Sequence, residues 1–266
     1  MHCSRSCRVL LAGALGFAAL ACWGEPEIPG DTPTGLLTVF GKSVDGGYVV
    51  QPEGVFVLAP NRPAADSRWA PDSCAAGAYE PQVIGSVPDL NAGDSILVTF
   101  GAVTAVMRPV NRFGFNQYVL AHDTMSYTPG TTVRFVIPGA SGDFPAATIS
   151  SVMPLAVTSI SPIPAQPATT EPLVVTWHPA GDGSTTFELL LLYSLEGATD
   201  FNQQVICSWR DDGAGAIPGE LLQGWALSEF QRRIEATRYR TERQLIGDHV
   251  LFLLATFDTV PRVAVP

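Results

Sequence analysis

The chain contains little charge and almost no lysine. Charged residues make up 15% of its 266 positions, Lys42 is the single lysine among 15 basic residues, and the formal net charge is −10. An acidic surface disfavours nucleic acid as a partner and an electrostatic hold on anionic lipid. Hydrophobic residues amount to 46%, which is ample for folded cores. We therefore expect a folded protein that does not bind nucleic acid.

Common signatures of catalysis are missing as well. The sequence contains no P-loop, no G-x-S-x-G, no H-E-x-x-H and no paired C-x-x-C. His122-Asp123 and Asp248-His249 are adjacent pairs, and neighbours in a strand point to opposite faces, so neither pair indicates a catalytic dyad. We expect structural or surface roles for these residues and for His178. No catalytic residue and no cofactor is predicted.

The C-terminal half contains two groups of charged residues. Asp182, Asp211 and Asp212 lie in glycine-rich stretches that could supply oxygen ligands to calcium, but their spacing matches no EF-hand and Asp-Gly turns are common in hairpins. No metal is therefore expected. On a strand, the even-numbered members of the basic cluster would share one face. We expect a solvated outer face, with an anionic-ligand or partner surface as the alternative; the cluster comprises Arg232, Arg233, Arg238, Arg240 and Arg243.

An apolar run near the N-terminus, residues 9–21, is too short for a membrane span, which needs about 20 residues. Arg5 and Arg8 precede it, as is typical of a secretory signal peptide. The sequence Ala19-Leu20-Ala21-Cys22 resembles the lipobox of bacterial lipoproteins, with its leucine displaced by one position. The resemblance implies cleavage of residues 1–21 and lipidation of Cys22. A conventional cleavage in a secreted protein and an uncleaved membrane anchor are the alternatives.

Residues 22–35 combine prolines, glycines and acids and are expected to form a disordered tether. Trp23 would follow the lipidated cysteine. In enteric bacterial lipoproteins, aspartate at that place retains the protein in the inner membrane. Its absence favours an outer-membrane lipoprotein whose partner is the membrane, through the lipid anchor. A soluble secreted or periplasmic protein is the alternative.

A proline-rich segment, residues 153–172, divides the rest of the chain. Its prolines exclude a helix or a central strand and favour linker and strand-edge structure. The lengths on either side each suit one domain. We predict domains at residues 36–153 and 154–266. The prolines are Pro154, Pro162, Pro164, Pro167 and Pro172.

Short apolar runs between turns predict an antiparallel sandwich or barrel-like fold for residues 36–153. Asp45-Gly46 between two such runs predicts a hairpin. Residues 61–95 show no strand pattern, and Trp69 and Tyr79 are expected either to anchor this loop over the core or to contact a protein or glycan partner. Strands are expected at residues 36–40, 48–50, 54–59, 96–100, 103–108, 113–120, 132–137 and 147–152.

The second domain also reads as a series of strands. The run Phe187 to Tyr193 lacks alternation and is expected to be central, and Pro218 to Leu222 predicts a helical turn. Strands are expected at residues 155–160, 173–177, 185–193, 203–209, 232–240 and 249–257.

Several short motifs in this half resemble uncharacterised immunoglobulin-like modules of envelope lipoproteins from GC-rich Gram-negative bacteria. They are Thr176-Trp177-His178-Pro179, Gly181-Asp182-Gly183, Ile206-Cys207, Asp212-Gly213 and Ile217-Pro218. The resemblance implies an immunoglobulin or fibronectin-III-like sandwich located in the envelope. It implies no particular activity. The expected fold is therefore all-β, with two antiparallel β-sandwich domains after the signal peptide and tether.

Two cysteines remain once Cys3 and Cys7 leave with the signal peptide and Cys22 is lipidated. An oxidising envelope permits a disulfide between Cys74 and Cys207, but sequence alone cannot supply its geometry. A bridge between the domains, two separate thiols and intermolecular pairing all stay open.

Two functions from different classes fit these observations. We expect a non-enzymatic envelope lipoprotein that serves binding, adhesion or scaffolding. The alternative is an envelope hydrolase, acting on glycan or peptide, with a site assembled from dispersed loop residues. A pocket with two convergent carboxylates, or a carboxylate and a histidine, would favour the enzyme.

Overall fold

The structure is a computed structural model. It describes residues 32–59, 72–79, 88–112, 115–122, 124–157, 159–162, 167–195, 197–198, 200–228, 231–258 and 263–264. The expected signal peptide and residues 22–31 of the expected tether lie outside these ranges. Residues 32–35 were also assigned to the tether, but they pair with residues 56–59 and begin the first strand.

Strands dominate the fold, so the all-β prediction is confirmed. One large sheet has the order β3-β13-β12-β15-β16-β1-β2-β6-β5-β4-β8-β9, with β7 pairing with β2 and β17 with β15. A small sheet has the order β10-β11-β14. The 3-10 turn η2 (Gly219–Leu222) leads into the short helix α1 (Gln223–Leu227) at the expected helical turn. The strands are β1 (Thr32–Val44), β2 (Gly47–Ala59), β3 (Ser73–Ala78), β4 (Ile96–Phe100), β5 (Val103–Arg112), β6 (Phe115–Leu120), β7 (Met125–Ser126), β8 (Thr132–Ile137), β9 (Ala147–Val152), β10 (Ile160–Ser161), β11 (Leu173–Trp177), β12 (Thr186–Tyr193), β13 (Gln203–Arg210), β14 (Ala214–Ile217), β15 (Arg232–Ile246), β16 (His249–Asp258) and β17 (Val263–Ala264).

Strand β1 lies in the middle of the large sheet. Its antiparallel hairpin with β2 turns at Asp45 and Gly46, whose φ values of 48° and 80° suit the predicted two-residue turn. On its other side β1 pairs in parallel with β16, from Thr34 opposite Val250 to Lys42 opposite Asp258. The two ends of the described chain therefore meet in one sheet.

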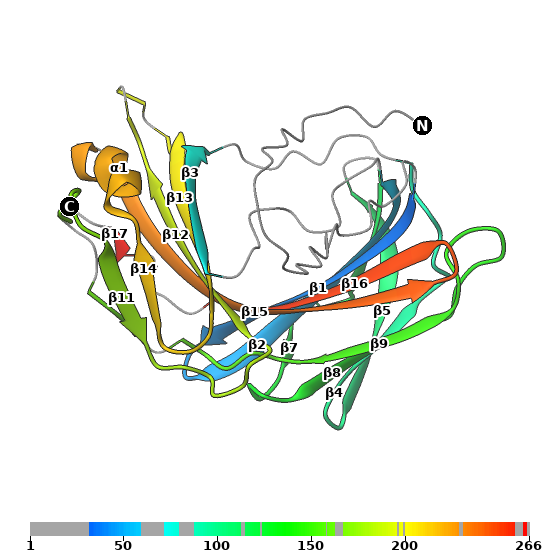
Figure 1. Ribbon diagram of the computed structural model, residues 1–266. Helices are drawn as coiled ribbons and strands as arrows, with labels where there is room; N and C mark the ends of the chain where they lie inside the picture. The colour runs from blue at the N-terminus through cyan, green and yellow to red at the C-terminus, as the bar shows by residue number, and fades with distance from the viewer. Residues whose placement is uncertain are drawn as a thin grey trace, which may run out of the picture.

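The part of the large sheet from β16 to β9 curves into a roll (Figure 1). Its last strand, β9, comes against β15 and β16, where the Ser151 hydroxyl donates to Glu242 Oε1 at 3.2 Å. Alternate side chains of these strands face the interior, because a strand presents every second residue to one side. Together with Phe144 of the β8–β9 connection they form a first core, whose strand residues include Leu37, Val39, Phe56, Val98, Met107, Tyr118, Phe135 and Leu253.

A second core lies between the small sheet and the β12, β13 and β15 part of the large sheet. Strand β12 is central, between β13 and β15, as expected. The 3-10 turn and α1 add Leu222 and Trp225 to this core. Its other members include Val175, Trp177, Phe187, Leu189, Val205, Cys207, Trp209, Ile217 and Ile234.

The two cores do not separate along the chain at residue 153, and here the structure differs from the expected division. Strand β15 pairs with β12 over residues 232–239 and with β16 over residues 237–246, so one strand passes from the second core to the first. Strand β16 then contributes Leu251, Leu253 and Ala255 to the first core. The last hairpin thus completes a core that the N-terminal half begins.

Several described residues in the first part of the proline-rich segment pack into the cores. Met153, Val157 and Ile160 are buried in one core or the other. Strand β10 forms an edge of the small sheet, which agrees with the strand-edge structure expected for a proline-rich sequence.

Candidate functional site

Arg238 lies on β15 where that strand leaves the second core. Its side chain is 2% exposed, and Arg232 is also buried, so a solvated outer face is wrong for these two arginines. Ile234 and Ala236 belong to the second core, and the alternation of a strand carries Arg238 inward on the same face. The alternation of Ile234 and Ala236 with charged residues is the sequence signal from which this burial could have been predicted.

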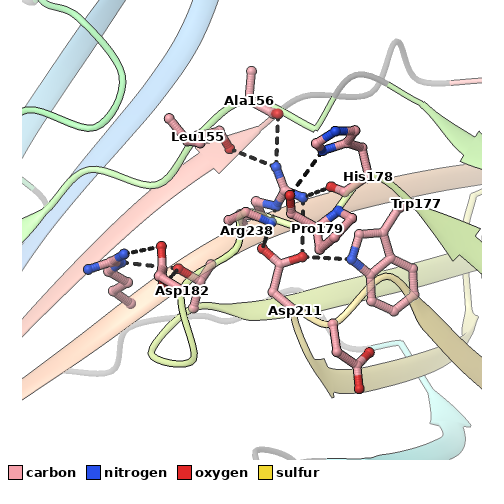
Figure 2. Close-up of polar contacts among 12 residues, drawn as sticks. Leu155, Ala156, Trp177, His178, Pro179, Asp182, Asp211 and Arg238 are labelled. Atoms are coloured by element: carbon pink, nitrogen blue, oxygen red, sulfur yellow. Dashed lines mark hydrogen bonds and ion pairs between the residues drawn. The ribbon is translucent and has the colours of Figure 1, made fainter.

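The counter-charge comes from Asp211, which directly follows β13 and is fully buried. Arg238 Nε lies 2.7 Å from Asp211 Oδ2, and Nη2 donates to Oδ1 at 3.1 Å. Trp177 Nε1 donates to Oδ1 at 2.7 Å (Figure 2). The Ala180 backbone N–H donates to Oδ2 at 3.2 Å. The indole of Trp177 stacks on Phe187 with ring centroids 3.9 Å apart. The carboxylate therefore has the hydrogen bonds that a buried charge requires.

The remaining donors of Arg238 reach the backbone of two other segments. Nη1 donates to the carbonyl oxygen of Ala156 at 2.9 Å and to that of Leu155 at 3.4 Å, and Nη2 donates to the carbonyl oxygen of His178. One side chain thus joins β15 to the proline-rich segment and to the end of β11 (Figure 2). Because its charge is paired and solvent is excluded, this cluster can hold segments together but offers no free group for proton transfer.

A second ion pair lies beside the first. Arg240 contacts Asp182 through Nη2 and donates from Nε to Thr185 Oγ1 at 3.1 Å. Thr185 and Ser184 hydroxyls donate to Asp182 Oδ1 at 2.7 and 3.1 Å. Burial by itself raises the pKa of Asp182, but the Thr185 hydrogen bond, the charge of Arg240 and the Ser184 hydrogen bond outweigh it, so the pKa is lowered overall.

The three aspartates considered for calcium therefore have other partners. Asp182 and Asp211 face arginines, and Asp212 Oδ1 accepts the Ala214 N–H at 3.4 Å. Within the described ranges, no group of three or more His, Cys, Asp or Glu side chains is placed to hold a metal ion.

The stretch from residue 61 to 95 contains a strand that sequence reasoning missed. Strand β3 pairs with β13 at the end of the large sheet, and a disulfide joins Cys74 to Cys207 there, with an S–S distance of 2.04 Å. Of the interpretations left open, this is the bridge between the two halves of the chain. Tyr79 is half-buried and its N–H donates to the Asn202 carbonyl at 3.0 Å. Trp69 and Cys22 lie outside the described residues.

The histidines are dispersed. His122 is exposed, and His178 Nδ1 lies 3.0 Å from the Pro179 carbonyl oxygen. For Asp248-His249, the expectation of opposite faces is wrong, since His249 Nδ1 lies 2.7 Å from Asp248 Oδ1. The reason is that Asp248 belongs to the turn before β16, where strand alternation does not apply.

In the described part of the chain, no helix has the length and apolar character required to cross a bilayer. Comparison of the chain with protein-family models finds no match, and comparison with curated proteins finds none either.

Proposed function

We propose that the protein is a lipid-anchored component of the bacterial cell envelope with a non-enzymatic binding, adhesion or scaffolding role. The observation that carries the proposal is the disulfide between Cys74 and Cys207. Disulfides persist in oxidising compartments and are rare in the cytosol. The bond therefore supports export, as does the signal-like sequence that ends at Cys22.

The buried and partly buried ion pairs of the C-terminal half support a structural or binding role. Asp211 with Arg238, and Asp182 with Arg240, form ion pairs that join segments of the fold. Catalytic carboxylates instead need access to a substrate and must be able to gain or lose a proton during the reaction. We further infer that the second core, with sheets on both sides, corresponds to the immunoglobulin-like module implied by the sequence motifs.

The anchor is tested by fractionating cells that express the full chain or its Cys22→Ala variant. We expect the wild type in the membrane fraction and the variant in the soluble envelope fraction, because a lipid on Cys22 would be the only hydrophobic attachment left after cleavage. Cys7→Ala is the matched control, since that cysteine would leave with the signal peptide, and it should remain with the membrane. A membrane-bound wild type whose N-terminal peptide has an unmodified mass would overturn the anchor.

Export is tested separately by the state of the two remaining cysteines. Thiol labelling under denaturing, non-reducing conditions should leave Cys74 and Cys207 unlabelled in the exported protein. The same chain without residues 1–21, retained in the cytosol, should label at both positions. Equal labelling of the two forms would contradict an oxidising location.

A further inference from the structure

Strand β3 is the last strand at one end of the large sheet, and within the described residues no other strand pairs with its second edge (Figure 1). Its sequence is SCAAGA, and its last four residues are exposed. Sheet edges in natural proteins are usually protected by charged side chains, prolines or bulges. Strand β3 contains no charged residue and no proline. Its side chains therefore do not oppose the addition of a further strand.

The pairing of β13 decides which backbone groups point toward β3. The N–H of Asp211, directly after β13, donates at 3.2 Å to the carbonyl of Thr185, which directly precedes β12. The N–H of Arg210 donates at 3.3 Å to Oδ1 of Asp72, which directly precedes β3. Because backbone groups along a strand point alternately to its two neighbours, the even-numbered residues of β13 face β3 and the odd-numbered ones face β12.

The odd-numbered residues of β3 consequently point inward. Ser73, Ala75 and Gly77 lie opposite even-numbered residues of β13. The residues whose backbone N–H and C=O groups point outward are Cys74, Ala76 and Ala78. The Ala78 carbonyl accepts the Gln204 side chain at 3.3 Å, and a carbonyl oxygen can accept two hydrogen bonds. The outer edge thus offers the alternating donors and acceptors that an added strand requires.

Strand β3 is held in place at both ends. Cys74 is bonded to Cys207, which is 1% exposed. Just beyond the other end, the N–H of Tyr79 donates to the Asn202 carbonyl at 3.0 Å. An edge that is already ordered loses less conformational entropy when a partner binds.

The outer edge of β3 is complementary to itself. When two copies of the strand run antiparallel about Ala76, Cys74 of each copy lies opposite Ala78 of the other. Every outward N–H then meets an outward C=O. The residues that face each other across this pair are alanine, glycine and the bridged cysteine, so neither bulk nor like charge opposes the approach. A two-fold contact of this kind closes on itself and gives a dimer.

We propose that β3 joins two copies of the protein by antiparallel pairing of their outer edges, so that their large sheets form one continuous sheet. One strand edge buries less surface than the roughly 1,200–2,000 Å² of a stable interface. The dimer should therefore be weak in dilute solution and populated where copies are concentrated, as on a membrane that anchors them.

The inference names the partner for the binding or scaffolding role proposed above, and it rests on that role. The pairing itself needs no lipid. It is measured with purified protein in solution, whereas the anchor is tested by fractionating the Cys22→Ala variant, so the two can fail separately.

Amide spectra of the purified protein at increasing concentration test the pairing. The outward amides should shift and exchange their hydrogens more slowly as concentration rises, because they acquire acceptors. The amides of Ala75 and Gly77 already pair with β13 and should change less. In a mixture of carbon-13-labelled and unlabelled protein, a contact between the Hα atoms of Ala75 in one copy and Gly77 in the other would identify the register.

Proline at position 76 blocks the outer edge without breaking the ladder to β13, because the N–H that it removes points outward. Ala76→Pro should lower the association constant about tenfold or more, since each copy loses its central hydrogen bond. Ala76→Ser keeps the N–H, is the matched control and should associate as the wild type does. Sedimentation equilibrium measures association, and thermal unfolding verifies that each variant is folded.

Ala76→Lys provides a second test that retains the backbone N–H. It places like charges opposite each other at the two-fold axis, so association should weaken at low salt and partly recover at high salt. A wild type that shows no association at any concentration would overturn the proposal. Association that persists in both Ala76→Pro and Ala76→Lys, or spectral changes confined to amides outside β3, would overturn it as well.

Discussion

Replacing Asp211 with alanine tests whether the buried ion pair holds the fold together. The change leaves the Arg238 guanidinium charged and 2% exposed, without its carboxylate. It also leaves Trp177 Nε1–H and the Ala180 N–H without their acceptor. Removing one member of a buried pair costs about 3–5 kcal/mol, and the orphaned donors favour the upper part of that range. For a chain of this size the melting temperature should fall by about 10 °C or more.

An exposed ion pair in the same protein serves as the control. Asp72 Oδ2 lies 3.6 Å from Arg210 Nε, and the two side chains are 55% and 72% exposed. Exposed pairs contribute less than about 1 kcal/mol, so Arg210→Ala should change the free energy of unfolding little. Arg210 is the partner to replace, because Asp72 has a φ of 63° and its Oδ1 also accepts the Arg210 backbone N–H at 3.3 Å. The two variants therefore each remove one partner, from a buried pair in Asp211→Ala and from an exposed pair in Arg210→Ala.

Urea unfolding, followed by tryptophan fluorescence and far-ultraviolet circular dichroism, measures these differences. The double variant Asp211→Ala/Arg238→Met should lose less free energy of unfolding than the sum of the single variants, by about 2 kcal/mol, because the second change removes the unpaired charge left by the first. An Asp211→Ala midpoint no lower than that of Arg210→Ala would refute the assignment of Asp211 as a structural anchor. If the free-energy change of the double variant equalled the sum of the changes of the two single variants, Asp211 and Arg238 would not be energetically coupled.

Three further predictions concern the bridge, the chain division and the acid response. Replacing Cys74 and Cys207 with serine should lower the free energy of unfolding by about 2–5 kcal/mol, because the bond constrains residues 133 apart in the unfolded chain; coincident urea curves for oxidised and reduced protein would argue against this. Residues 32–153 expressed alone should show no cooperative thermal transition, since β16 pairs with β1 and completes the first core, and a sharp transition by circular dichroism would contradict that. The native pKa of Asp182 is lowered, so its contribution to stability is present above the unfolded value of about 3.9 and is lost as the pH falls through the native value. Melting temperatures of Asp182→Asn and wild type should accordingly differ above about pH 4 and converge in stronger acid, whereas a constant difference at all pH values would exclude this origin.

Local patterns predicted most strands because alternation and turn residues act over a few positions. Strands β4, β8, β9 and β11 have the expected bounds, and the turn at Asp45 and Gly46 has the expected backbone. Strand β3 was missed because its sequence, SCAAGA, is small and lacks the branched and aromatic residues typical of strands. Its position depends on pairing with β13 and on the disulfide, which are both long-range contacts.

For the charged residues of the site, too, some features follow from local sequence patterns and others depend on long-range contacts. The sequence predicts that Arg238 and Arg240 share a strand face, and the structure agrees. Whether that face meets water depends on which strands and loops lie over it. Asp211 was considered as a calcium ligand because aspartate beside glycine is common in such loops, and only its proximity to Arg238 changes that interpretation.

By itself the sequence determined the all-β class, the central place of β12 and the β1–β2 hairpin. These features follow from the spacing of apolar residues along the chain and from the residue types at turns, which are both properties of neighbouring residues. The tertiary structure decided the parallel pairing of β1 with β16, the passage of β15 between two cores and the burial of Arg238 against Asp211. These features join residues that lie far apart in the chain. Their free energies depend on burial and on partners that no local pattern specifies.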